Sequence, residues 1–341
     1  MNPILSVVIP THRRAKLATR AIASVADVHA GTDVEILVVP NGNDETWKTI
    51  AERHSHDPRI RWLYLPAGNA SAARNHGLSN AQGKYLRFLD DDDYLLPAAA
   101  DQLRLIERQD LDVCSAPLEN TSTDGSRREA LRLPDTSDFV AAAIQSARIS
   151  LTQGSVFKRE FILKNRWREN VDLYDDYLWM LDLAASAEAA WASMPIPVCA
   201  YVQHHGDRLS RVRRSGANSR LLVEALLQLH HLLERKGRLT PERNVAVATA
   251  LLTQAHSSFP ASPLFLGATI RRATAIAPDA RPLQPVFDAY PWLARHLLAV
   301  EWTALAPRYL SRGCRRATWS VGRMLERLEK SASARSGAND P

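Results

Sequence analysis

The stretch Tyr85-Leu-Arg-Phe-Leu-Asp-Asp-Asp-Asp-Tyr-Leu-Leu-Pro97 decides how the chain is interpreted, because an apolar strand pattern runs directly into four aspartates. Like charges a few ångströms apart repel, so at least one carboxyl would keep its proton unless a cation neutralises the group. Mg²⁺ and Mn²⁺ accept carboxylate oxygens and commonly complete their shell with substrate phosphates. The segment predicts a divalent-metal site for a phosphate-bearing substrate. An acidic turn or helix cap without metal is the alternative.

Two earlier segments have the same strand character as the residues before the aspartates. Leu5–Ile9 and Glu35–Val39 are short, apolar and rich in branched side chains. Helical periodicity over 15–25 and 45–53 separates the strands, which predicts a parallel sheet with helices on both sides. Ligands of such sheets bind beyond the carboxyl ends of the strands. One site is therefore expected where three polar loops meet, at residues 10–14, 40–44 and 90–93.

Phe88–Pro97 resembles the metal-binding segment of family 2 glycosyltransferases, typically FLDxDDxxxP. Asn69–Gly77 and Ala81–Tyr85 are similar to the family's A-R-N and A-x-G-x-Y elements. The resemblance spans roughly residues 4–210 and implies an α/β GT-A fold, a mixed sheet flanked by helices, with an α-helical C-terminal extension. It also implies metal-dependent, inverting transfer of a sugar from a nucleotide-diphosphate donor to a hydroxyl of a saccharide or lipid-linked acceptor, in cell-surface polysaccharide synthesis.

The resemblance assigns separate roles within the acidic segment. Asp90 and Asp91 are expected to contact the donor nucleotide, and Asp92 to bind Mn²⁺ or Mg²⁺, with Asp93 as a near alternative. His204, in Tyr-Val-Gln-His-His-Gly, is similar to the histidine of a late Y-R-x-H element and is expected to complete the metal shell. A structural histidine is the alternative for this position.

Five further residues are expected at the donor. Pro10 and Thr11 match the family's opening P-T pair, and Arg14 falls on the usual arginine. Arg74 can bind a phosphate or base bidentately, although an arginine that only neutralises the carboxylates is the alternative. Asn41 lies where the family often has a carboxylate that contacts the base, so a preference for uracil does not follow.

The acceptor side is read from a second set of motifs. Gln153–Phe157 resembles the family's acceptor-side strand and serves mainly as a positional marker. The spacing from Trp167 places Asp175 and Asp176 on the family's Glu-Asp-Tyr element, which makes Asp176 the expected catalytic base, with Asp175 beside it. Inverting transfer needs such a carboxylate to take the acceptor's proton. Acids that only favour a helix N-terminus are the alternative, and Asp182 departs from the family's arginine.

Three units are expected along the chain: a catalytic domain over 1–214, a helical basic extension over 215–330 and a disordered tail over 331–341. From residue 215 onward, 17 Lys and Arg face 9 Asp and Glu. Residues 310–328 form a basic amphipathic helical pattern, for which we hypothesise peripheral contact with an anionic inner-membrane surface. A helix packed on the enzyme body is the alternative. Nucleic acid is not an expected partner, because the catalytic part is slightly acidic.

The remaining features bound the compartment and the chemistry. The sequence has no apolar run long enough to span a membrane and no signal-peptide pattern, so a cytoplasmic location is expected. Its three cysteines form no C-x-x-C pair. A nucleotidyltransferase is a rival reading, although Pro10–Arg14 lacks that class's glycines. A non-catalytic nucleotide-sugar-binding subunit is a second rival, kept open by Pro40, Asp182 and Val202, which replace family residues.

Overall fold

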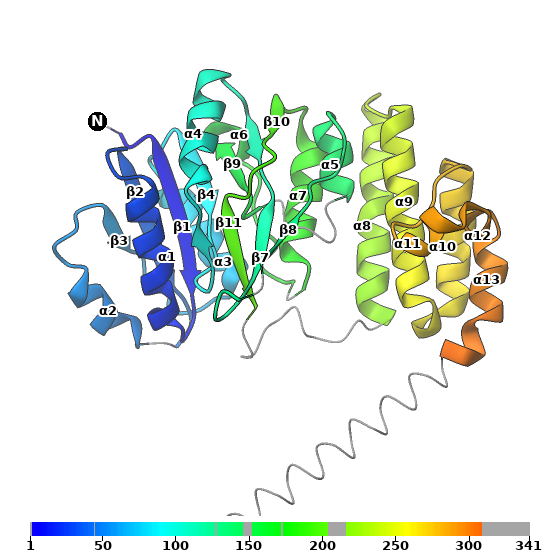
Figure 1. The fold of residues 1–341 in the computed structure, drawn as a ribbon, viewed down its shortest axis with the longest axis horizontal. Helices are drawn as coiled ribbons and strands as arrows, with labels where there is room; N and C mark the ends of the chain where they lie inside the picture. Colours follow the sequence, from blue (N-terminus) through cyan, green and yellow to red (C-terminus); the bar gives the residue numbers. More distant parts are fainter. Residues whose placement is uncertain are drawn as a thin grey trace, which may run out of the picture.

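The computed structural model describes residues 2–43, 45–126, 128–145, 152–171, 173–203 and 216–308. Its first part carries two sheets and its last part is helical (Figure 1). The seven-stranded sheet has, in spatial order, β10 (Trp191–Ser193), β6 (Val113–Ser115), β9 (Ser155–Lys158), β4 (Tyr85–Phe88), β1 (Leu5–Thr11), β2 (Val34–Pro40) and β3 (Ile60–Trp62). The four-stranded sheet has β5 (Tyr94–Leu95), β11 (Cys199–Gln203), β7 (Leu118–Ser122) and β8 (Arg128–Leu131).

The three strands expected from the sequence are present as β1, β2 and β4, and they run parallel as expected. Farther out, β9 runs antiparallel to both β4 and β6, so the complete sheet is mixed. The adjacent strands β4, β1, β2 and β3 are therefore all parallel, and β6 and β10 form a further parallel pair beyond β9. Between β4 and β9 the chain forms three strands of the second sheet, β5, β7 and β8. The sequence pattern did not predict this second sheet.

Helices flank the large sheet, and the apolar side chains packed beneath them form two separate cores. The helices in the first part of the chain are α1 (Ala15–Val28), α2 (Trp47–Arg53), α3 (Ala70–Asn80), α4 (Ala98–Arg108), α5 (Phe139–Gln145), α6 (Arg159–Ile162) and α7 (Asp175–Ser186). One core lies under α1 and α4, and a second, larger core lies under α3, α5 and α7. The cores hold the strand ends, and hence the loops after them, in fixed positions.

The C-terminal helices extend the larger core without a break. They are α8 (Gly216–Arg235), α9 (Pro241–Ser258), the short 3₁₀ helix η3 (Phe259–Ala261), α10 (Pro263–Ile276), α11 (Pro285–Ala289), α12 (Pro291–Arg295) and α13 (Leu297–Thr303). Helical spacing in the sequence predicts helices over 221–234 and 245–256, and α8 and α9 confirm them. The same spacing over 292–305 predicts a single helix, which is wrong: α12 ends at Arg295, and α13 begins at Leu297 with Leu297 and Glu301 buried.

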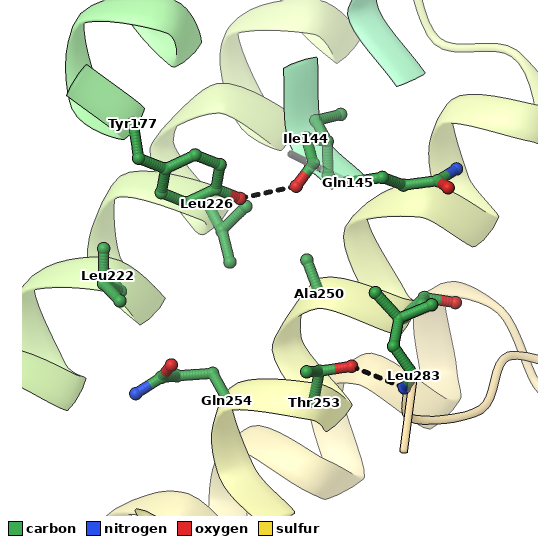
Figure 2. A pocket seen from close by; sticks show the side chains of 10 residues that line it. Ile144, Gln145, Tyr177, Leu222, Leu226, Ala250, Thr253, Gln254 and Leu283 are labelled. Carbon is green, nitrogen blue, oxygen red and sulfur yellow. Dashed lines mark hydrogen bonds between the residues drawn. The ribbon is translucent and has the colours of Figure 1, made fainter. Parts of the chain in front are cut away.

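The extension joins the catalytic part through α8, which packs on α7, and α9, which packs on α5. Arg243 of α9 lies 2.7 Å from carboxylates of both Asp138 and Glu188. A cavity of about 30 Å³ lies at this junction, and beside it the Tyr177 hydroxyl donates to the Ile144 carbonyl at 2.6 Å. Figure 2 shows these two residues among those that line the cavity. Ion pairs of Arg243 therefore accompany the apolar packing between the extension and the first part of the chain.

Several expectations lie outside the described residues: the boundary at 214, the basic segment 310–328 and the tail 331–341. Over the described ranges, none of the helices combines the length and apolar character needed to cross a bilayer.

His29 provides a test of the core beneath α1. Its side chain is 1% exposed, and neither ring nitrogen has a hydrogen-bond partner among the described residues. Burial, with repulsion from Arg87 and Arg104, lowers the pKa of His29 to about 4. The unfolded chain takes up this proton near pH 6.5, so stability falls as pH drops from 6.5 toward 4.

We predict that His29→Leu loses about 2 kcal/mol less unfolding free energy than the wild type between pH 6.5 and 4.5. Urea denaturation at the two pH values measures this difference. His56→Leu, at an exposed histidine, is the control and should behave as the wild type. Equal acid losses in all three proteins would contradict the assignment.

Candidate active site

The loops after β1, β2 and β4 meet at one edge of the sheet, as expected for parallel strands. Thr11 donates its hydroxyl to Asp91 Oδ2 at 2.7 Å. Asn41 donates its side-chain amide to the Thr11 carbonyl at 3.0 Å. Pro10 is buried in β1, opposite Val39, and so fixes the backbone that presents Thr11. The three loops are therefore tied by direct hydrogen bonds.

The four aspartates after β4 face different ways. Carboxylate oxygens of Asp90, Asp92 and Asp93 lie within 4.8 Å of one another, whereas Asp91 turns toward Thr11. Asp93 is fully buried and accepts a hydrogen bond from the Val202 backbone at 2.8 Å, which ties β11 to the cluster. Three convergent carboxylates are hard oxygen ligands, and they fit Mg²⁺ or Mn²⁺.

Burial shapes the electrostatics of this cluster. It raises the pKa of Asp91 to about 7 and the pKa of Asp90 above its usual value, and repulsion from Asp92 adds to both shifts. A divalent cation would favour the ionised forms again, because opposite charge stabilises a carboxylate. The donor atoms and their electrostatics both suit a metal.

Arginines close one side of the cluster. Arg14 Nη1 lies 3.2 Å from Asp92 Oδ2 and 3.8 Å from Asp91 Oδ1, and its side chain is 35% exposed. Arg20, on the next turn of α1, donates to the Asp92 carbonyl at 2.5 Å. A partly exposed guanidinium beside a carboxylate pair can exchange that contact for a phosphate group.

Arg74 links this cluster to the acids at the start of α7. It is 5% exposed, with Nη2 2.8 Å from Asp90 Oδ1 and Nη1 2.7 Å from Asp175 Oδ2. Asp176 Oδ1 lies 4.0 Å from the same Nη1. Burial works against the charge, but Asp90 and Asp175 outweigh it and raise the pKa of Arg74 above its ordinary value. One planar guanidinium thus spans two acidic centres.

An aromatic platform holds Arg74 in place. Its guanidinium lies 4.5 Å from the ring centroid of Trp167. Trp167 stacks on Trp179 of α7 at 4.8 Å and meets Phe88 of β4 edge-on at 5.2 Å. Asn75, one residue after Arg74, donates to the Trp167 carbonyl at 2.9 Å. Trp167 therefore contacts α7, β4 and Arg74 together.

The family model for glycosyl transferase family 2 matches residues 6–168. The uncharacterized glycosyltransferase YibD of Escherichia coli (strain K12) is 24% identical over 298 residues, which cover 84% of each chain. The chain is a glycosyltransferase whose residues 6–168 match family 2.

The glycosyltransferase also resembles solved structures. The structure of Staphylococcus aureus TarS residues 1–349 in complex with UDP-GlcNAc matches with a TM-score of 0.66, at 16% identity, over 90% of this chain and 91% of that one. The fold is accordingly GT-A. A Campylobacter jejuni relative, the GalNAc(5)-diNAcBac-PP-undecaprenol beta-1,3-glucosyltransferase, is 36% identical over 106 residues, 30% of this chain and 33% of its own.

Three positions singled out from the sequence of this glycosyltransferase do not contact the acidic cluster directly or lie outside the described residues. Asn41 is 4% exposed and uses its amide to join the loops after β1 and β2. Asp182, which departs from the family's arginine, pairs with Arg168 at 2.6 Å and so keeps an ion pair at that point. His204 and the adjacent His205 lie outside the described residues.

Sequence reasoning missed several residues of the site. Trp167 was used only to set the register, and Asn75 only as part of a motif, yet both orient Arg74 or its support. Arg20 carried no signal of its own, because a spacing of six residues from Arg14 does not place two side chains on one helix face. Gln153 was used only as the start of a positional marker, and its contact with Asp90 could not be seen because the two residues lie 63 positions apart in sequence.

We predict that Arg74→Met lowers the unfolding free energy by about 3 kcal/mol, because two largely buried carboxylates lose their cation. Arg74→Lys should lose less, since it keeps the charge but not the planar fork. Urea denaturation at pH 7 measures both. Arg104→Met, which breaks a surface pair with Asp101, is the control and should change stability by at most about 0.5 kcal/mol. An Arg74→Met variant as stable as the wild type would contradict the bridging role.

Proposed function

We propose that this glycosyltransferase moves a sugar, with inversion and with a divalent metal, from a nucleotide-diphosphate donor to a hydroxyl of a saccharide or lipid-linked acceptor. The observation that supports this most is the Arg74 bridge between Asp90 and Asp175. It fixes the acidic cluster at Asp90, which suits a metal ion and a diphosphate, beside the second acidic centre at Asp175. Inverting transfer needs these two centres for opposite tasks.

The metal in this proposal is Mn²⁺ or Mg²⁺, held through Asp92 with Asp90 or Asp93 beside it. Such a cation supplies charge that stabilises the departing diphosphate. His204 is proposed as a further ligand, on the family resemblance alone. Asp91 contributes indirectly, because its bond to Thr11 fixes the loop after β1 against the cluster.

Donor binding is proposed to use the loops after β1 and β2. Thr11 and Arg14 offer a hydroxyl and a partly exposed guanidinium beside the cluster. Arg74 is proposed at the donor on the family resemblance, and its two terminal nitrogens hold Asp90 and Asp175 in place there. Pro10 and Asn41 keep these groups in register from the buried side.

Asp176 is the proposed catalytic base, and Asp175 its anchor. Both begin α7, where backbone N–H groups stabilise carboxylates. Asp175 is the closer of the two to Arg74, at 2.7 Å against 4.0 Å for Asp176. The tighter pair suits a fixed support, and the looser one suits a carboxylate that must accept a proton from the acceptor hydroxyl.

We predict that calorimetry of the wild type against UDP, GDP, CDP and dTDP, with and without Mn²⁺, detects metal-dependent binding of one diphosphate. Asp92→Asn should weaken this binding at least about 10-fold, because losing even a residue that only orients a metal ligand typically costs that much affinity. Asp176→Asn should keep the binding but lose sugar transfer or donor hydrolysis by about 100-fold or more.

Asp182→Asn is the matched control, because this acid lies on the same helix and pairs with Arg168 rather than with Arg74. It should retain binding and turnover. A folded wild type that binds none of the four diphosphates would contradict the proposal. Binding without any turnover would instead favour a non-catalytic nucleotide-sugar-binding subunit, and synthesis of a nucleotide sugar would favour a nucleotidyltransferase.

We also propose peripheral contact with an anionic membrane through the basic segment 310–328, a location that suits a lipid-linked or polysaccharide acceptor. The support is compositional: six arginines flank apolar residues at helical spacing between 308 and 328. This proposal is independent of the catalytic one.

We predict that the full chain co-sediments with vesicles of anionic phospholipid at low salt, and that added NaCl releases it. Replacing Arg312, Arg315 and Arg316 by Gln should reduce the bound fraction several-fold, because each basic residue adds about 1 kcal/mol at such a surface. Vesicles of zwitterionic lipid are the control. No sedimentation with anionic vesicles at low salt would rule the contact out.

A further inference from the structure

Arg87 is a buried cation without a matching carboxylate. It lies on β4, three residues before Asp90, and is 0% exposed. Burial lowers the pKa of Arg87 to about 10, which leaves it charged at neutral pH. Among the described residues, its hydrogen bonds go only to neutral groups. Burying such a charge is costly, and these hydrogen bonds offset part of the cost. They also tie Arg87 to the groups that accept them.

Those bonds converge on one turn ahead of β9. Arg87 Nη1 donates to the Gln153 carbonyl at 3.0 Å, and Nη2 donates to the Gln102 side-chain oxygen. Gln102, on α4, donates in turn to the Gly154 carbonyl at 2.8 Å. Two successive carbonyls of this turn are thus fixed from the core.

Gly154 shows how tightly the turn is held. A Cβ at this position would lie 2.3 Å from the Ala116 carbonyl oxygen, so no other residue fits without a backbone shift. The Ala116 N–H donates to the Gly154 carbonyl at 2.8 Å. The backbone next to Gln153 is therefore set before any ligand arrives.

The Gln153 side chain carries this rigidity into the acidic cluster. It is 2% exposed, and its Nε2 donates to Asp90 Oδ2. The other oxygen of Asp90 accepts from Arg74 at 2.8 Å. The amide orientation follows from the chemistry, because the reverse orientation would set two acceptor oxygens together. Both oxygens of Asp90 are therefore oriented, one by Arg74 of the donor side and one by Gln153 of the acceptor-side segment.

We propose that Gln153 is a positioning residue for Asp90 in the donor site, and that Arg87 acts through Gln153. This inference rests on the proposed function, since it assumes that Asp90 contributes to donor and metal binding. Partners that orient a ligating or ligand-binding carboxylate typically affect affinity 10–100-fold when they are removed, an order of magnitude that applies here as well. The acceptor-side strand thereby helps to build the donor site.

The test is calorimetric titration with Mn²⁺ and the nucleoside diphosphate that the wild type binds best. Gln153→Met keeps the side-chain volume and removes the hydrogen bond, and it should raise Kd about 10–100-fold. Gln284→Met is the matched control. Gln284 lies in the helical extension, is partly buried and donates a hydrogen bond to Ser257 Oγ at 2.9 Å. Its Kd should equal that of the wild type.

A double-mutant cycle separates positioning from a general structural effect. In the Asp90→Asn background, Gln153→Met should change Kd by less than about two-fold, because the group it orients is already altered. Kinetics should show a raised donor KM with an unchanged acceptor KM. Arg87→Lys, which keeps the charge but loses the fork, should shift Kd in the same direction as Gln153→Met.

The outcomes are distinct. An unchanged Kd in Gln153→Met, with wild-type binding intact, overturns the inference and leaves the proposed function standing. Additive effects of Gln153→Met and Asp90→Asn overturn it as well. A wild type that binds no diphosphate overturns the proposed function and this inference together. If Gln153→Met does not fold, Gln153→Asn, whose shorter amide cannot reach Asp90, takes its place with the same expected loss.

Discussion

The active site depends on one interaction, the buried guanidinium of Arg74 between Asp90 and Asp175. Without it, carboxylates from β4 and α7 would face each other across a poorly hydrated space, and their repulsion would separate the two elements. The planar fork satisfies both at once, and its central carbon lies over the Trp167 ring, 4.5 Å from the centroid. A lysine has the charge but not that geometry.

The acidic cluster is balanced by several partial neutralisers. Arg14 and Arg20 approach Asp92 from α1, Thr11 binds Asp91, and the Val202 backbone binds Asp93. Burial still holds the pKa values of Asp90 and Asp91 above their usual range. The cluster is thus underneutralised in a way that favours a cation or a protonated state, which is a common property of sites that bind metal and phosphate.

The helical extension is part of the same body as the catalytic fold. The larger core runs from beneath α3 through α7 into α8, α9 and α10, and Arg243 pins α9 to two acids of the catalytic part. Because α7 carries the proposed base on its first turn and packs on α8 along its length, the extension helps to fix the position of that base.

The sequence by itself determined the first strands, the acidic segment, the Arg74 and Asp175 motifs and the family, because these are local patterns of two to ten residues. Only the tertiary structure decided that β9 runs antiparallel, that Asp91 turns away from the other three aspartates, and that Gln153 reaches Asp90. The helix break at His296 is of the same kind. The physical reason is that these features arise from contacts between residues far apart in sequence, where burial and hydrogen-bond satisfaction override local preference.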